Sequence, residues 1–383
     1  MLSMTGRYKL NIGVIIRLVL PYVLLIINGS VYGKKYYTNY WTFAYFLCLL
    51  LLHGKRIVYQ SKKYYIMGHL RKHIILLSCV VLLVSLFNFN FSDTFLFIVL
   101  FATILIYTDM DNYMKELSIS SNIMLLCSAF ILIGFNTGRL LSQWNPNQIA
   151  MITVSSIYFF FISWEYAKHK ILNFVLCVVT LYGVWKTESR AMVVGVLVAV
   201  FIICIFSKKV FLRNKSLIKL FIFTIAIIPF LVIVWNMLYL NTELSAVLND
   251  FFLKYTSKTV YSGRESIWSQ WIPIMLQPKY LLIGNGERIA GNLHSLIADV
   301  WYSYGSVTML LYINMMFSTS KYIVYTFNDR IVRNSFASFC GMYIAQSFEC
   351  MSSDTTYFYV FMYVFLGITI GRCITIYYGM ENA

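Results

Sequence analysis

The hydrophobic positions of this chain of 383 residues form long unbroken runs and do not alternate with polar positions. Most runs approach the roughly 20 residues that a helix needs to cross a membrane. Only helices satisfy their own backbone within lipid at such lengths, whereas strands of a barrel would alternate apolar and polar positions. The pattern therefore predicts an all-α polytopic membrane bundle of about 12 transmembrane helices. The runs are 12–28, 38–53, 74–91, 94–108, 122–135, 149–163, 171–186, 191–207, 220–240, 294–317, 335–352 and 355–377.

The composition excludes an ordinary soluble protein. Hydrophobic residues make up 60% of the chain and charged residues 12%, against about 25% charged residues in a soluble domain. A soluble core could not absorb so much apolar surface. We therefore expect one integral membrane domain over residues 1–383, in which the first run is retained as a span because no convincing small-residue cleavage site follows it.

The net charge of +16, from 31 Lys and Arg and 15 Asp and Glu, would suit two kinds of anionic partner, nucleic acid or membrane lipid. In a soluble chain it would suggest nucleic acid, but basic residues of membrane proteins gather in cytoplasmic segments and face anionic lipid. With the N-terminus inside, the basic clusters at 55–72 and 208–219 become cytoplasmic, and the short outer segments keep few Lys or Arg. This predicts both termini in the cytoplasm, contact with membrane lipids and no nucleic-acid partner.

The same orientation places the segment 241–293 on the outer face of the membrane. The other connections are roughly twenty residues or shorter, and long connections in compact proteins are more often functional than idle. We therefore expect the working surface of the protein at this long external loop.

Polar residues gather on the predicted outer face. An isolated Arg there could simply extend to lipid headgroups. Guanidinium groups also bind phosphate oxygens through paired donors, so Arg residues facing one cavity would suit a diphosphate. The polar clusters contain Arg139, Asn145-Pro146-Asn147, Glu188-Ser189-Arg190, Gly263-Arg264-Glu265, Gly284-Asn285-Gly286 and Asn292-Leu293-His294-Ser295.

His294 enters a predicted span at the end of the long segment. A lone His at an interface can be a hydrogen-bonded structural residue, or a neutral imidazole that accepts a proton from a hydroxyl nucleophile. The aromatic residues Trp268 and Trp271 belong either to an interface belt or to a platform for sugar rings. Both alternatives stay open at each position.

The remaining candidates are weaker. Arg17 lies inside the first span, with a structural or a functional role. Glu188, Glu349 and Asp354 can simply pair with arginines. No metal-ligand spacing, GxSxG elbow or P-loop occurs, and the eight cysteines show no CxxC or Cys/His clustering. The sequence thus predicts neither a metal nor a cofactor.

The order of the polar motifs resembles the O-antigen ligase/polymerase superfamily, which includes the Wzy-like polymerases of surface polysaccharides. The resemblance covers roughly residues 136–310. The family usually has Asn after the His, where this chain has Ser295. The residues that carry the resemblance are Asn145-Pro146-Asn147, Ser189-Arg190-Ala191, Ser262 to Trp268, Pro278, Gly284-Asn285-Gly286, His294-Ser295 and Gly305.

The resemblance implies a GT-C-like, metal-independent membrane glycosyltransferase acting on undecaprenyl-diphosphate-linked sugars at the outer face of a bacterial cytoplasmic membrane. It implies that Arg190 and Arg264 hold the diphosphate leaving group and that His294 deprotonates the acceptor hydroxyl. With this chemistry, Arg139, Asn147, Trp268 and Asn292 are the expected substrate-binding residues. A flippase and a chain-length regulator are the expected protein partners.

Two rival functions are weighed against a repeat-unit polymerase. A ligase that transfers finished polymer to a terminal acceptor would use the same chemistry, and the sequence does not separate the two. A flippase for the lipid-linked oligosaccharide would line a central cavity with charges in several spans, whereas here the spans after Arg17 carry few charges. The polymerase is therefore the leading hypothesis.

Overall fold

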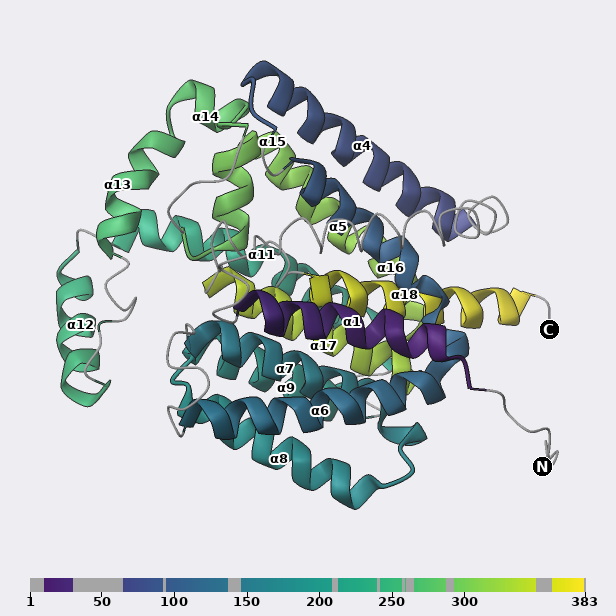
Figure 1. Ribbon diagram of the computed structural model, residues 1–383. Coiled ribbons are helices and arrows are strands. Elements are labelled where there is room, and N and C mark those ends of the chain that lie inside the picture. Colours follow the sequence, from purple (N-terminus) through teal and green to yellow (C-terminus); the bar gives the residue numbers. More distant parts are fainter. Residues whose placement is uncertain are drawn as a thin grey trace. The chain divides into compact units, whose positions relative to one another are not determined.

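The computed structural model describes residues 10–29, 65–91, 94–136, 146–208, 213–239, 242–256, 259, 265–286, 293–348 and 360–381. Across these ranges every regular element is a helix and no strand occurs (Figure 1). Each predicted apolar run has a helix, apart from 38–53, which lies outside the described residues. The all-α prediction is confirmed.

Five described stretches are long and apolar enough to cross a membrane, and the chain is a membrane protein on this ground. Two further apolar helices, Ile12–Val23 and Arg190–Ile205, are shorter. The count of about 12 spans and the GT-C-like assignment stay predictions. The five stretches are Tyr65–Phe87, Phe97–Ile133, Ile149–Tyr166, Lys215–Trp235 and Val360–Gly379.

The helices group into two compact units, and each unit combines two separate segments of the chain. Unit 1 combines residues 1–42 with 109–189, and unit 2 combines 43–108 with 190–383. The segment 241–293, predicted as the long external loop, therefore belongs to unit 2. The expectation of one integral membrane domain stays a prediction.

Unit 1 is built around α6. Helix α6 packs on each of the other three long helices of the unit, and α7 also contacts α1 and α8. Two short 3₁₀ turns, η1 (Tyr107–Tyr113) and η2 (Trp164–Tyr166), lead into α6 and out of α7. The four long helices are α1 (Ile12–Gly29), α6 (Met114–Asn136), α7 (Pro146–Ser163) and α8 (Lys170–Lys186).

A buried ion pair joins the start of unit 1 to η1. The Arg17 guanidinium donates to both carboxylate oxygens of Asp109, at 2.9 and 3.2 Å. The two side chains are only 3% and 7% exposed. A charge that would be costly alone in a membrane helix is thus paired and hydrogen-bonded. This pairing gives Arg17 a structural role.

Further polar contacts hold α1 against the rest of unit 1. The Tyr22 hydroxyl is hydrogen-bonded to Ser128, and Ser128 lies 2.8 Å from the Ser156 hydroxyl. At the beginning of α1, the Asn11 amide donates to the buried Glu116 carboxylate at 3.0 Å. Buried hydroxyl and carboxylate groups that are paired in this way avoid the penalty of an unmet hydrogen bond.

Unit 2 contains the remaining helices, with α17 packed between α9 and α18. Helix α18 continues the packing onto α5, α5 onto α4, and α4 onto α15. The helices are α4 (Tyr65–Phe87), α5 (Thr94–Ile106), α9 (Arg190–Ile205), α11 (Lys215–Tyr239), α12 (Glu243–Thr256), α13 (Glu265–Met275), α14 (Pro278–Leu282), α15 (Leu296–Phe317), α16 (Ser320–Thr326), α17 (Arg330–Phe348) and α18 (Val360–Glu381).

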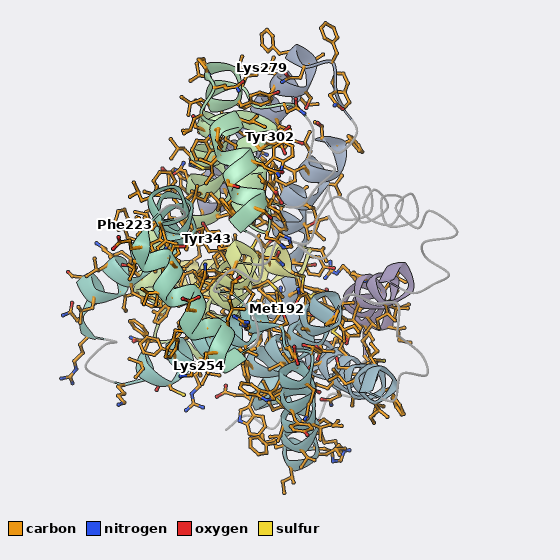
Figure 2. All side chains as sticks on the ribbon, turned by 90° about the vertical axis from the view of Figure 1, so that its left-hand side faces the viewer. Met192, Phe223, Lys254, Lys279, Tyr302 and Tyr343 are labelled. Atoms are coloured by element: carbon orange, nitrogen blue, oxygen red, sulfur yellow. The ribbon has the colours of Figure 1, made fainter. Side chains whose placement is uncertain are left out.

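Helix α17 is buried on every side, although many of its residues are polar or small. Its serine hydroxyls stay within the helix: Ser335 and Ser347 donate to the carbonyls of Ile331 and Tyr343, both at 2.7 Å. The buried Tyr343, labelled in Figure 2, donates its hydroxyl to the Ala226 carbonyl of α11 at 3.1 Å. These three hydroxyl groups are therefore satisfied without water.

Two glycines let α18 approach the α5 segment closely. A Cβ on Gly367 would lie 2.6 Å from the Ile104 carbonyl oxygen, and one on Gly371 would overlap the Thr108 carbonyl. Glycines four residues apart are a common means of close helix packing in membranes. The spacing Gly367-Ile-Thr-Ile-Gly371 was a readable signal that the sequence analysis did not use.

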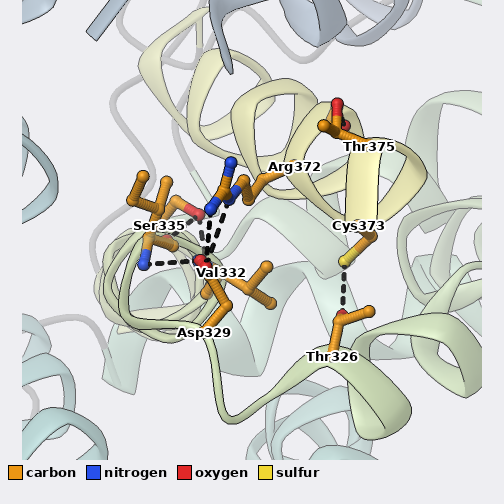
Figure 3. Close-up of polar contacts among 9 residues, drawn as sticks. Thr326, Asp329, Val332, Ser335, Arg372, Cys373 and Thr375 are labelled. Carbon is orange, nitrogen blue, oxygen red and sulfur yellow. Dashed lines mark hydrogen bonds and ion pairs between the residues drawn. The ribbon is translucent and has the colours of Figure 1, made fainter. Parts of the chain in front are cut away.

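The N-terminal end of α17 is fixed by Asp329. Its Oδ1 accepts from the backbone amides of Ile331 and Val332 at 2.9 and 3.1 Å, which caps the helix. Its Oδ2 accepts from two guanidinium nitrogens of Arg372 on α18 (Figure 3). Thr326 and Cys373 form a second polar contact beside this pair (Figure 3).

Candidate functional site

The site residues predicted from sequence are divided between the two units. Arg190, Trp268 and His294 lie in unit 2, whereas Asn147 lies half-buried near the start of α7 in unit 1. Three further candidates, Arg139, Arg264 and Asn292, lie outside the described residues, as do Glu349 and Asp354. Unit 2 therefore supplies the described geometry of the candidate site.

A kink in α15 organises this part of unit 2. Gly305 has φ 81° and ψ 168°, which no L side chain adopts readily, and it interrupts the helix. The carbonyls of the turn before the kink accept hydrogen bonds from outside the helix. Asn285 donates its amide to Tyr302 at 2.9 Å, and Gly286 donates to Ser303 at 2.7 Å. The Gly-Asn-Gly segment thus docks by its backbone on α15.

Three glycines make this docking possible. Gly284 and Gly286 have φ of 74° and 80°, and a Cβ on Gly284 would lie 2.5 Å from the Tyr304 amide nitrogen. A Cβ on Gly305 would overlap the Leu282 carbonyl. Close contact between the two backbones, together with the positive φ, is therefore the reason for glycine at these positions.

His294 lies at the entrance of α15 in a rare backbone conformation. Its φ is 53°, in the left-handed region that few non-glycine residues occupy. The residue is half-buried. Sparsely populated conformations cluster at active sites and ligand clamps, which makes an observed one a reason for a functional hypothesis.

Ser295 has a clear structural task. Its side-chain oxygen accepts from the Ala298 amide at 3.4 Å and so caps α15, and the residue is fully buried. Asn and Ser rank together among the best N-cap residues. Ser295 can therefore perform the capping task that an Asn after the His would also perform. Capping is the signal that the sequence analysis missed here.

Arg190 is the first residue of α9 and is half-buried. Phe206 at the end of α9 contacts Phe327 just before α17, with ring centroids 5.8 Å apart. The two helices are therefore antiparallel, and Arg190 lies toward the end of α17 that contains Gln346. Guanidinium donors at the positive end of a helix dipole are suited to a phosphate group.

The aromatic residues of α13 face inward to different degrees. Trp268 is 4% exposed, so both faces of its ring are covered. Trp271 is half-buried and meets the Tyr302 ring edge-on at 5.2 Å, and Tyr280 stacks on Tyr302 at 5.6 Å. Since a ring must be exposed to stack on a sugar, this geometry favours a packing role for Trp268.

Potential metal ligands are scattered. Among the residues that the structure describes, no group of three or more His, Cys, Asp or Glu side chains could hold a metal ion. The described residues of the candidate site instead offer a cation at Arg190, an imidazole at His294 and backbone donors and acceptors around α15.

The comparisons with known proteins leave the family open. No family model matches the chain, and neither a curated protein nor a solved structure matches it. Membership of the O-antigen ligase/polymerase superfamily therefore stands as a proposal.

Proposed function

We propose that this membrane protein is a glycosyltransferase of the O-antigen ligase/polymerase superfamily that joins undecaprenyl-diphosphate-linked oligosaccharide repeat units into a surface polysaccharide. One observation carries the proposal. The motif residues meet at one element: Gly284 to Gly286 dock on the first half of α15, His294 precedes that helix, and Gly305 kinks it. Because these motifs converge on one helix, they support the proposed family and a site at this helix.

In the proposed reaction, His294 acts as the general base. It takes the proton from an acceptor sugar hydroxyl, whose oxygen attacks the anomeric carbon of the donor. The new glycosidic bond forms as the bond to the lipid diphosphate breaks, with inversion at the anomeric carbon. Arg190 and Arg264 hold the diphosphate as negative charge develops on it, where stabilisation lowers the barrier most.

A ligase with the same catalytic residues is the alternative function. It would transfer a finished polymer from the lipid diphosphate to a terminal acceptor, whereas a polymerase extends the chain with lipid-linked repeat units. In the proposal both termini are cytoplasmic, 241–293 is external, and a flippase and a chain-length regulator are partners.

The test is a polymerisation assay with purified full-length protein in liposomes and lipid-linked repeat units as both donor and acceptor. His294→Ala should lower the rate by about 10² to 10⁴, the usual contribution of general base catalysis. His169→Ala, which changes a histidine of unit 1 next to α8, is the matched control and should retain activity. Full activity of a well-folded His294→Ala protein would remove His294 from the mechanism. Transfer only to a terminal acceptor would favour the ligase.

Two further measurements address the metal-free mechanism and the orientation. Excess EDTA should leave polymerisation unchanged, because arginines replace a metal as the diphosphate clamp. A loss that Mg²⁺ or Mn²⁺ restores would refute this.

Reporter fusions at Lys215 and Lys258 should report cytoplasmic and external positions. The reverse pair of signals would overturn the orientation and the proposed site with it.

A further inference from the structure

Helix α12 presents an apolar face to its surroundings. Leu244, Val247 and Phe251 recur at helical spacing and are 51%, 63% and 55% exposed. Leu248 continues the same face and is half-buried. Large apolar side chains that gather on one face of an exposed helix mark a surface that is covered by another apolar phase.

The other side of α12 contains most of its polar residues. Glu243, Asn249 and Asp250 lie there, and Glu243 and Asp250 are exposed. Leu253, 46% exposed, lies among them. Lys254, labelled in Figure 2, lies at the border between the two faces, where its stem can reach out to headgroups. A helix with large apolar residues on one face and charges on the other is typical of helices that lie in a membrane interface.

The preceding helix, α11, faces lipid and ends next to α12. Exposed apolar residues follow one side of α11: Phe223 at 62%, Leu231 at 54% and Leu238 at 71% (Phe223 is labelled in Figure 2). In the last turns of α11, Trp235 stacks on Tyr239 with ring centroids 5.4 Å apart. Tyr239 is buried, whereas Trp235 is 50% exposed. Because an exposed Trp favours the headgroup level of a bilayer, α11 reaches the interface at Trp235.

The corner between α11 and α12 is fixed by hydrogen bonds. The Tyr239 hydroxyl donates to the carbonyls of Leu244 and Ser245 at 3.4 and 3.3 Å. Thr242 donates its hydroxyl to the Tyr239 carbonyl at 2.9 Å, and its oxygen lies 3.4 Å from the Ser245 amide. The first turn of α12 is therefore held against the end of α11.

We infer that α12 lies in the headgroup and acyl boundary of the leaflet at the end of α11, with Leu244, Val247 and Phe251 among the acyl chains. In the predicted orientation this is the outer leaflet. The ligand is the phospholipid surface itself. The inference holds whatever reaction the protein catalyses, so its test needs no activity.

The experiment is photolabelling of the full-length protein in liposomes that contain a phospholipid with a diazirine on its acyl chain. Mass spectrometry then measures labelling of peptides from α12 and from α11 around Phe223, which serves as the lipid-facing reference. We expect both peptides to be labelled in the parent protein. Phe251→Glu should lower labelling of α12 about tenfold, because it replaces a large apolar side chain that faces the acyl chains by a charge. Asn249→Glu places the same charge on the polar face and should change nothing.

The conservative variant Phe251→Trp guards against a folding defect and should retain the label. An unlabelled α12 beside a labelled α11 reference would overturn the inference, and so would equal labelling of Phe251→Glu and Asn249→Glu. Cross-linking of an unlabelled α12 to a second copy of the chain would assign the apolar face to self-association and overturn it as well.

Discussion

Polar side chains join the helices of both units of this membrane protein, and unit 2 adds close backbone contact at glycines. In unit 1, polar side chains join the helices through the Arg17–Asp109 ion pair and the contact of Tyr22 with Ser128. In unit 2, backbones approach each other at glycines, as Gly371 does toward Thr108 and Gly305 toward Leu282. Lipid tails are as apolar as leucine, so burial alone gives helices little reason to associate in a membrane.

The difference shows that a charge within a membrane helix need not line a substrate path. Arg17 would be a functional candidate from its position alone, yet its carboxylate partner satisfies it inside unit 1. The candidate site of unit 2, in contrast, contains backbone groups and a half-buried His294. Variants of the two kinds of contact should therefore fail for different physical reasons.

The largest expected effect comes from separating the buried ion pair. Arg17→Leu leaves Asp109 buried without its partner and should lower the free energy of unfolding by about 3 to 5 kcal/mol. The double variant Arg17→Leu with Asp109→Leu removes both charges and should regain most of the loss. Denaturant titration of the purified protein in detergent measures both changes.

The ion pair of unit 2, Arg372 with Asp329, tests how much burial contributes to the loss. Arg372 and Asp329 are 28% and 21% exposed, so water screens them and Arg372→Leu should cost less than Arg17→Leu. An equal loss in the two single variants would contradict the distinction between the two pairs.

Gly305→Ala should have the next largest effect. It places a Cβ on a residue with φ 81° and against the Leu282 carbonyl, and strain together with overlap should cost about 3 kcal/mol. The docking of residues 284–286 should loosen, which hydrogen exchange at the Gly286 amide detects. Unchanged protection of that amide would argue against the kink as its cause.

A smaller loss is expected at the contact of α18 with the α5 segment. Gly371→Ala forces a methyl group against the Thr108 backbone and should cost about 1 to 3 kcal/mol. Gly379→Ala is the control on the same helix, because nothing lies within 4 Å of its Cβ position. The two variants should separate clearly in thermal unfolding, and indistinguishable midpoints would refute close packing at Gly371.

The smallest effect concerns the cap of α15. Ser295→Ala should lower the free energy of unfolding by about 1 kcal/mol, whereas Ser295→Asn should be nearly neutral because Asn is an equally good N-cap. Thermal unfolding compares the two. A stable Ala variant with reduced polymerisation would instead assign Ser295 a role in the reaction.

Hydrophobic runs predicted the helices well, because lipid demands long apolar segments. They predicted boundaries less well: α4 begins at Tyr65, ahead of the run at 74–91, since the helix continues through basic residues that hydropathy excludes. The segment 241–293 was predicted as a loop but contains α12, α13 and α14. Short amphipathic helices do not show in a search for long apolar runs.

The candidate site was less accessible from sequence than the helices. Residue types and spacing pointed to His294 and Gly305, but the hydrogen bonds from Asn285 and Gly286 to α15 depend on a kink that no local pattern specifies. The partner of Arg17 lies 92 positions away in the chain. Such long-range pairs follow from three-dimensional packing and cannot be read from spacing.

The docking of residues 285 and 286 on α15 also has a consequence for which substitutions can occur together. A Cβ on Gly284 would lie 2.6 Å from the Gly305 amide nitrogen, and a Cβ on Gly305 would overlap the Leu282 carbonyl. Both glycines therefore serve one contact between the same two backbones. Because effects at residues in contact do not add, a second methyl group at Gly284 should cost less once Gly305 has already been replaced. The two positions should thus tolerate change jointly more readily than singly.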